Sequence, residues 1–243
     1  MKTIPLSILI LFLLPVLFFC QSGDTIKTYL VNKTANTPVS IDGILDDAEW
    51  QGALVLTDFR FPWLDTATPY TEFRAQYSDS NFYFVFQVND TNIVLAENFK
   101  SEMDVLNEDR VEIFMSQDRE LKQYYALEID ALGRVMDTAA RFHRKFDRSW
   151  RCAGLRTSGV VTEGAYVVEG SIPVKTLKEI GVLNESGTIH AGVFRGEFHY
   201  GTNSEIIQHW ISWIDLRKKA PDFHVPDAFG LFKFTTKTID QQL

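Results

Sequence analysis

The amino-acid sequence predicts an all-β fold, an antiparallel β-sandwich of jelly-roll-like form with one or two short helices. Three observations predict it. Roughly ten short runs rich in aromatic and β-branched residues recur along the chain, separated by clusters of Gly, Asn, Asp and Ser. Several of these runs are close enough in sequence to pair as hairpins. A single segment, residues 174–180, has a helical pattern, and Gly181 ends it.

The chain divides into one large domain and three short segments. Residues 1–22 contain a lysine followed by an apolar run, which is typical of a secretion signal peptide. Residues 23–37 form a polar N-terminal lead-in, with an edge strand expected at 28–32. Residues 38–236 have the length of one β domain, and residues 237–243 form a C-terminal tail.

The predicted signal peptide indicates an exported protein that is secreted, periplasmic or on the cell surface. Lipid attachment at Cys20 is the alternative, although Phe19 stands where lipoprotein processing favours a small residue. Either route leaves Cys152 without a partner for an internal disulfide. Beyond such a lipid anchor, no membrane is expected as a partner.

Composition and charge narrow the class of protein. Hydrophobic residues make up 45% of the chain and aromatic residues 13%, which is enough for a large core and excludes a disordered chain. The formal net charge of −8 argues against nucleic acid or an anionic membrane surface as the main partner.

Two runs in the middle of the domain organise the rest of the chain. If residues 107–115 and 124–130 are strands, their side chains alternate between the two faces of a sheet. The short polar segment between them makes the strands antiparallel neighbours, so that Glu112 and Glu128 could lie side by side. Two carboxylates there would repel each other unless a cation or a hydroxylated ligand lies between them. Arg110 or Arg195 could supply the cation, and a bound polyol could supply the hydroxyls.

The start of the domain combines a strand with a helical turn. Residues 39–41 are expected as a short strand that meets a turn at Asp42-Gly43. Residues 46–47 can cap a helical turn ending near Trp50. We expect Trp50 to plug one end of the core, because large aromatic side chains dominate core energetics.

The next segments contain many aromatic residues. Trp63 lies in the turn-rich stretch 59–70 and is expected on a loop or rim. Residues 71–78 and 81–88 form a predicted hairpin. Apolarity is almost continuous over 82–86, which indicates a central strand buried on both faces.

The second half of the domain supplies further strands and one basic loop. The strands are expected at 135–139, 155–162, 166–172, 189–200, 208–214 and 229–234. Residues 141–156 concentrate basic side chains around Trp150. This segment is either a solvated loop or a patch for uronate or sulfate groups on a glycan, with Trp150 as the stacking surface.

Motifs for common catalytic chemistry are absent from the sequence. It has no Gly-x-Ser-x-Gly, phosphate loop, dinucleotide fingerprint or His-Glu-x-x-His pair. Glu112 and Glu128 raise the question of a glycoside hydrolase, but adjacent strands would hold the two acids close together on a shallow face. His199, His209 and His224 could form a metal site only if neighbouring strands bring them together.

Several stretches, in their order and spacing over about residues 38–234, resemble the family 9 carbohydrate-binding modules and their family 9-like relatives. The stretches that carry the resemblance are Ile41-Asp42-Gly43 with Asp46-Asp47-Ala48-Glu49-Trp50, Glu108-Asp109-Arg110-Val111-Glu112-Ile113-Phe114, Tyr124-Tyr125-Ala126-Leu127-Glu128-Ile129-Asp130, Arg195-Gly196-Glu197-Phe198, His209-Trp210-Ile211-Ser212-Trp213 and Pro221-Asp222-Phe223-His224-Val225-Pro226-Asp227.

The resemblance implies a sugar-binding β-sandwich, with structural calcium in some members. In the family, two Trp side chains clamp a sugar ring while an acid and a polar residue on adjacent strands bind hydroxyls. The acid corresponds to Glu112 and the polar position to Glu128, where those members have Arg. The two clamp positions fall near Leu106 and Phe223, so this chain lacks both clamp indoles. Trp63, Trp150, Trp210 or Phe223 would then have to supply the stacking surface.

The sequence therefore predicts an exported, non-catalytic domain that binds polysaccharide or oligosaccharide, with no cofactor other than a structural calcium ion that the resemblance allows. The predicted carbohydrate-binding residues are Glu112, Glu128, Arg195, Trp210, Phe223, His224, Asp109 and Trp150. Three alternatives remain open: an exported haem-binding or electron-transfer sandwich that uses Met103, Met115 or histidines, a glycoside hydrolase, and an interaction or structural domain.

Overall fold

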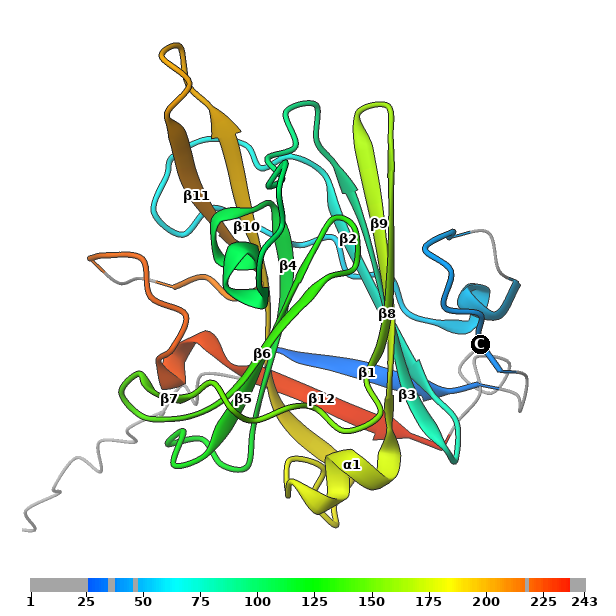
Figure 1. The fold of residues 1–243 in the computed structure, drawn as a ribbon. Helices are drawn as coiled ribbons and strands as arrows, with labels where there is room; N and C mark the ends of the chain where they lie inside the picture. The colour runs from blue at the N-terminus through cyan, green and yellow to red at the C-terminus, as the bar shows by residue number, and fades with distance from the viewer. Residues whose placement is uncertain (1–25, 35–37, 46–47, 217–218, 237–243) are drawn as a thin grey trace, which may run out of the picture.

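The computed structural model describes residues 26–34, 38–45, 48–216 and 219–236. Their strands join into one strongly curled sheet with the order β7-β6-β5-β4-β10-β12-β1-β2-β3-β9-β8, and β11 pairs with β10 (Figure 1). The predicted signal peptide, residues 23–25 and 35–37 of the lead-in, the pair 46–47 and the C-terminal tail lie outside the described residues.

Apart from β7, which falls in the basic segment 141–156 where no strand was predicted, the strands correspond closely to the predicted runs. They are β1 (Thr28–Lys33), β2 (Thr71–Tyr77), β3 (Asn81–Asn89), β4 (Arg110–Ser116), β5 (Tyr124–Asp130), β6 (Val135–Arg141), β7 (Lys145–Asp147), β8 (Arg156–Thr162), β9 (Ala165–Pro173), β10 (Thr188–Tyr200), β11 (Ile206–Ser212) and β12 (Gly230–Thr235). The short strand expected at 39–41 does not form. The only α-helix of the described residues, α1 (Val174–Glu179), occupies the predicted helical segment. The described residues also form three short 3-10 turns: η1 (Ala48–Gly52), η2 (Glu102–Asn107) and η3 (Pro226–Ala228).

The sheet is mixed rather than wholly antiparallel, which corrects the sequence prediction. Strand β1 runs parallel to both of its neighbours, β12 and β2, while the other named ladders are antiparallel. It is therefore an interior strand, not the edge strand expected at 28–32. Pairing of β1 with β12 joins the first and last strands of the described chain.

The main core lies inside the curl of the sheet. It combines side chains from β4, β5 and β10 with side chains from β2, β3 and β9, which are remote in the strand order. Alternation along β4 places Val111, Ile113 and Met115 in this core and turns Phe114 to the outer face. Continuous apolarity in β3 corresponds to burial on both faces, because Phe84 lies in the main core and Val85 in an outer cluster around Trp50.

Trp50 is buried as expected, at 1% exposed, but it packs with Val39, Tyr83 and Val85 in a cluster separate from the main core. Its indole Nε1 donates a hydrogen bond to Glu169 Oε1 at 2.8 Å. None of the helices in the described part of the chain is both long and apolar enough to span a bilayer.

Candidate functional site

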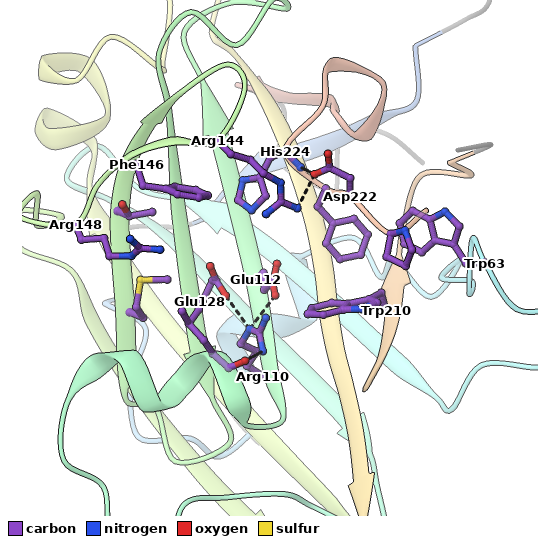
Figure 2. A pocket seen from close by; sticks show the side chains of 15 residues that line it. Trp63, Arg110, Glu112, Glu128, Arg144, Phe146, Arg148, Trp210, Asp222 and His224 are labelled. Carbon is purple, nitrogen blue, oxygen red and sulfur yellow. Dashed lines mark hydrogen bonds and ion pairs between the residues drawn. The ribbon is translucent and has the colours of Figure 1, made fainter. Parts of the chain in front are cut away.

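A cavity of about 240 Å³ opens on the outer face of β4, β5 and β6 (Figure 2). The loop around residues 221–224, the segment after β6 and the loop that carries Trp63 border it. The residues that line it are Trp63, Leu106, Arg110, Glu112, Glu128, Met136, Thr138, Arg144, Phe146, Arg148, Trp210, Pro221, Asp222, Phe223 and His224.

The floor of this pocket follows from strand alternation. Glu112 on β4 pairs directly with Glu128 on β5, and Glu128 pairs with Met136 on β6. Three side chains from three adjacent strands therefore point to the same face of the sheet. The prediction that the two glutamates lie side by side is confirmed by this register.

Arg110 holds the two carboxylates together. Its Nε donates to Glu112 Oε1 at 2.9 Å and to Glu128 Oε2 at 2.8 Å, and all three side chains are more than nine-tenths buried. Its Nη1 donates to the carbonyl oxygens of Leu106 and Glu108. The described residues provide no hydrogen bond to the second oxygen of either carboxylate, so those oxygens remain available to a ligand.

Burial of two acids around one cation favours retention of a proton. Loss of hydration, reinforced by the charge of Glu128, raises the pKa of Glu112 from 4.5 to about 8, although Arg110 opposes the shift. Burial also raises the pKa of Glu128. At neutral pH Glu112 therefore keeps its proton, which offsets the excess negative charge of two carboxylates around one cation.

Aromatic side chains form one wall of the pocket (Figure 2). Phe223 stacks on Phe194 with ring centroids 4.0 Å apart, and it contacts Trp63 and Trp210 at 5.6 and 5.9 Å. The Arg110 guanidinium lies 5.1 Å from the Trp210 ring, which links the ion triad to this wall. Both indoles are only half-buried, so their faces are partly open to a ligand.

The residues along the top of the pocket in Figure 2 are polar and basic. His224 Nδ1 lies 3.0 Å from the Tyr124 hydroxyl, and burial lowers the pKa of His224 from 6.5 to about 3, so its imidazole is neutral. Asp222 accepts from His143 at 2.7 Å and from Arg144 at 2.8 Å. These bonds fix the loop over the cavity, and Arg144 and Arg148 add positive charge at its entrance.

Five of the eight predicted site residues line the pocket: Glu112, Glu128, Trp210, Phe223 and His224. Leu106 and Phe223, the positions where the resembling family has its clamp indoles, line it as well. The strand register and the long loops thus bring together side chains from four separate parts of the chain.

The other three predicted residues lie elsewhere, which corrects their expected place beside the acids. Arg195 is fully buried in the main core and bonds Asp90 Oδ2 at 2.9 Å, because β10 pairs it with Val111 rather than with Glu112. Asp109 is fully buried and accepts from the backbone N–H groups of Val94 and Phe198. Trp150 packs on Tyr125 at 4.6 Å, on a different surface.

Sequence reasoning missed several lining residues. Met136 and Thr138 follow from the same alternation as Glu128, so the period of β6 could have identified them. Arg144 and Arg148 belong to the basic run of the sequence, but no local pattern places a loop over a particular cavity. Arg110, which the sequence offers as a cation between the acids, bonds both of them.

Residues 41–237 match the family described as carbohydrate family 9 binding domain-like. No protein of the curated set matches the chain.

Solved structures share the fold at low sequence identity. A candidate carbohydrate-binding protein from Bacteroides uniformis has a TM-score of 0.67 at 17% identity, covering 87% of this chain and 100% of that one. A carbohydrate-binding module of family 9 from Caldicellulosiruptor kristjanssonii in complex with glucose has a TM-score of 0.57 at 17% identity, covering 88% and 98%. A family 9 module from the same organism in complex with cellotriose has a TM-score of 0.61 at 16% identity, covering 88% and 96%.

Proposed function

The chain belongs to the carbohydrate family 9 binding domain-like family, and from this membership we propose that its pocket binds a sugar unit of an oligosaccharide or polysaccharide without cleaving it. The observation that carries the proposal is one cavity that combines an aromatic wall with a buried Arg and two glutamates. Sugars present apolar ring faces and a rim of hydroxyls, so they need both kinds of contact.

The dimensions favour a single ring over a long chain segment. At about 240 Å³ the cavity is smaller than the ~300–1,000 Å³ of ordinary small-molecule sites. We therefore infer that one terminal or exposed sugar unit enters the pocket, and that the remainder of the glycan extends past the rim formed by Trp63 and Pro221.

The protonation of the acid pair defines its hydrogen bonds. Because Glu112 keeps its proton near neutral pH, it can donate to a sugar oxygen, while Glu128 accepts from a hydroxyl. Arg110 keeps both groups in place. Trp210 and Trp63 would stack on the ring face that turns away from the glutamates.

The same geometry supports binding over hydrolysis. Glycosidase carboxyl groups act from the two sides of the scissile bond. Here both glutamates project from adjacent strands on the floor of the pocket, and one guanidinium nitrogen bonds both.

We propose further that residues 1–22 direct export, because a lysine and an apolar run open the chain.

Calorimetric titration of the full chain with glucose, cello-oligosaccharides and uronate-containing oligosaccharides tests the proposal. Trp210→Ala should weaken binding by about 1–2 kcal/mol, roughly 5- to 30-fold, through loss of a stacking face. Trp150→Ala is the matched control, because it removes a half-buried indole outside the pocket. Equal loss in both variants, or no binding to any glycan of the panel, would reject the pocket as the sugar site.

Chromatography of the same mixtures after long incubation separates binding from cleavage. We expect every oligosaccharide that binds to be recovered intact. Release of shorter products that disappears in Glu112→Gln would replace the binding proposal with a hydrolase.

A further inference from the structure

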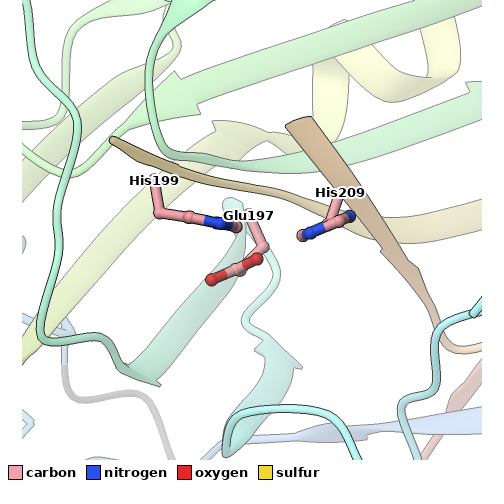
Figure 3. A group of neighbouring side chains, drawn as sticks. All are labelled: Glu197, His199 and His209. Carbon is pink, nitrogen blue, oxygen red and sulfur yellow. The ribbon is translucent and has the colours of Figure 1, made fainter. Parts of the chain in front are cut away.

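A second group of ligating side chains lies on the β10–β11 hairpin, outside the pocket (Figure 3). Glu197 and His199 alternate on β10, and His209 on β11 pairs directly with Glu197. One ligand atom from each residue can be chosen so that all three lie within 4.8 Å of one another. The imidazole centroids of His199 and His209 are 5.2 Å apart.

The register separates this group from the sugar pocket. Phe198 lies between Glu197 and His199 on β10, and Trp210 follows His209 on β11, so both rings turn to the other face of the hairpin. There Phe198 and Trp210 contact each other and Arg110. His224, which the sequence grouped with His199 and His209, lies in the pocket beside Tyr124, and Glu197 takes its place.

We propose that Glu197, His199 and His209 form a binding site for a divalent transition metal ion, with Zn²⁺ as the representative. Two imidazole nitrogens and one carboxylate oxygen are ligands that zinc and its neighbours in the first transition row accept readily. Calcium prefers six or more oxygen ligands, so this donor set does not suit it. Three protein ligands leave a fourth tetrahedral position for water or an external donor.

The side chains need only small rotations to close around an ion. In a tetrahedral zinc site, ligand atoms lie about 3.4 Å apart, given metal–ligand bonds of about 2.1 Å. All three side chains are half-buried, so water reaches the group and rotamer changes meet little packing. The backbone below is fixed by the β10–β11 ladder, and the Phe61 ring packs edge-on against His209 at 5.8 Å.

Titration of Zn²⁺ into the full chain, made without a histidine tag, tests the site by calorimetry at neutral pH. We expect one equivalent of tight binding and a rise in the thermal unfolding temperature, since an ion that binds only the folded state stabilises it. His199→Ala, His209→Ala and Glu197→Gln should each weaken that binding at least ~10-fold, because even outer-sphere changes cost that much.

Two controls keep the outcome specific. His190→Ala removes another half-buried imidazole from the same strand, and Glu163→Gln removes an exposed carboxylate in the β8–β9 turn. Both should bind zinc as the unsubstituted chain does. Zinc binding that persists in the three site variants, a stoichiometry below one in the unsubstituted chain, or equal site-dependent binding of Ca²⁺ would each overturn the proposal. Far-ultraviolet circular dichroism of every variant verifies the fold, and the double variant His199→Gln with His209→Gln repeats the test with polar replacements.

Discussion

Glu112 is the residue whose environment differs most from water among the pocket acids. It is 2% exposed and shares the Arg110 cation with Glu128, so its carboxylate lies next to a second carboxylate. A buried pair of carboxylates with one cation carries one excess negative charge, and uptake of a proton removes that charge. The charge of the pocket therefore depends on pH.

The free energy of unfolding should fall as pH rises from about 4.5 to about 8. In this interval the folded protein keeps the Glu112 proton, since its pKa is raised from 4.5 to about 8, while the unfolded chain has lost it. The stabilisation from this group is fully present below the pKa of Glu112 in the unfolded chain, and it is lost as pH rises through the pKa of Glu112 in the folded protein. The free energy of unfolding falls by up to ~1.4 kcal/mol per pH unit. Urea unfolding across this range measures the slope.

Glu112→Gln is the variant that isolates this effect, because the amide keeps the shape and cannot ionise. Its stability curve should be flatter over the same pH range, although burial also raises the pKa of Glu108 and Asp109 to about 7 and leaves some slope. Glu163→Gln, which replaces an exposed carboxyl group in the β8–β9 turn, is the matched control. Identical slopes in the two variants would contradict the assignment to Glu112.

At the scale of elements, the β3–β9 ladder depends on a glycine at position 170. Gly170 on β9 pairs with Phe84 on β3, and the Phe84 ring crosses the space where a Cβ of residue 170 would lie. Such a Cβ would approach the ring tip to 2.1 Å. The ring cannot move away easily, because it is fully buried between Phe82 and Phe86.

Gly170→Ala should therefore lower the free energy of unfolding by about 1–3 kcal/mol, the usual cost of overpacking a core. Gly52→Ala is the control, since its added Cβ would have its nearest neighbour at 3.9 Å. Urea denaturation of both variants gives the comparison. A Gly170→Ala protein as stable as the control would show that the ring packing is not as tight as described.

The elements were predictable to the extent that their signal is local. The hairpins of β2 with β3 and of β4 with β5 follow from alternation and a short polar turn, and both occur at the predicted positions. Arg195 was misplaced because its face depends on the register between β10 and β4, which are far apart in sequence. A shift of one residue would put it beside Glu112, where Phe194 stands.

At the scale of the whole molecule, the curl of the sheet brings distant strands together. The parallel pairing of β1 with β12 and β2 joins the two halves of the strand order. Parallel strands are not connected by a hairpin turn, so no local sequence pattern predicts this pairing. The loops over the pocket share this difficulty. Trp63 and Asp222 reach the site only because the folded sheet places their loops above the same face.

Arg195 links the two halves across the main core. It projects from β10, and its guanidinium bonds Asp90 Oδ2 at 2.9 Å just after β3, four places further along the strand order. It also contacts the Thr71 hydroxyl and lies 5.9 Å from the Tyr166 ring. The buried Arg195 charge is tolerated because the Asp90 carboxylate is buried next to it.

Asp90→Asn should therefore destabilise the protein by about 3–5 kcal/mol, because it removes the carboxylate that bonds the buried Arg195 guanidinium. The amide can still accept the Asn92 N–H through Oδ1, so the local turn is preserved. Glu179→Gln, which breaks the exposed pair with Lys175, should change stability by no more than about 0.5 kcal/mol. Adding Arg195→Met to Asp90→Asn should recover much of the loss, since no unpaired charge remains. If Asp90→Asn is as mild as Glu179→Gln in urea unfolding, the ion pair does not hold the halves together.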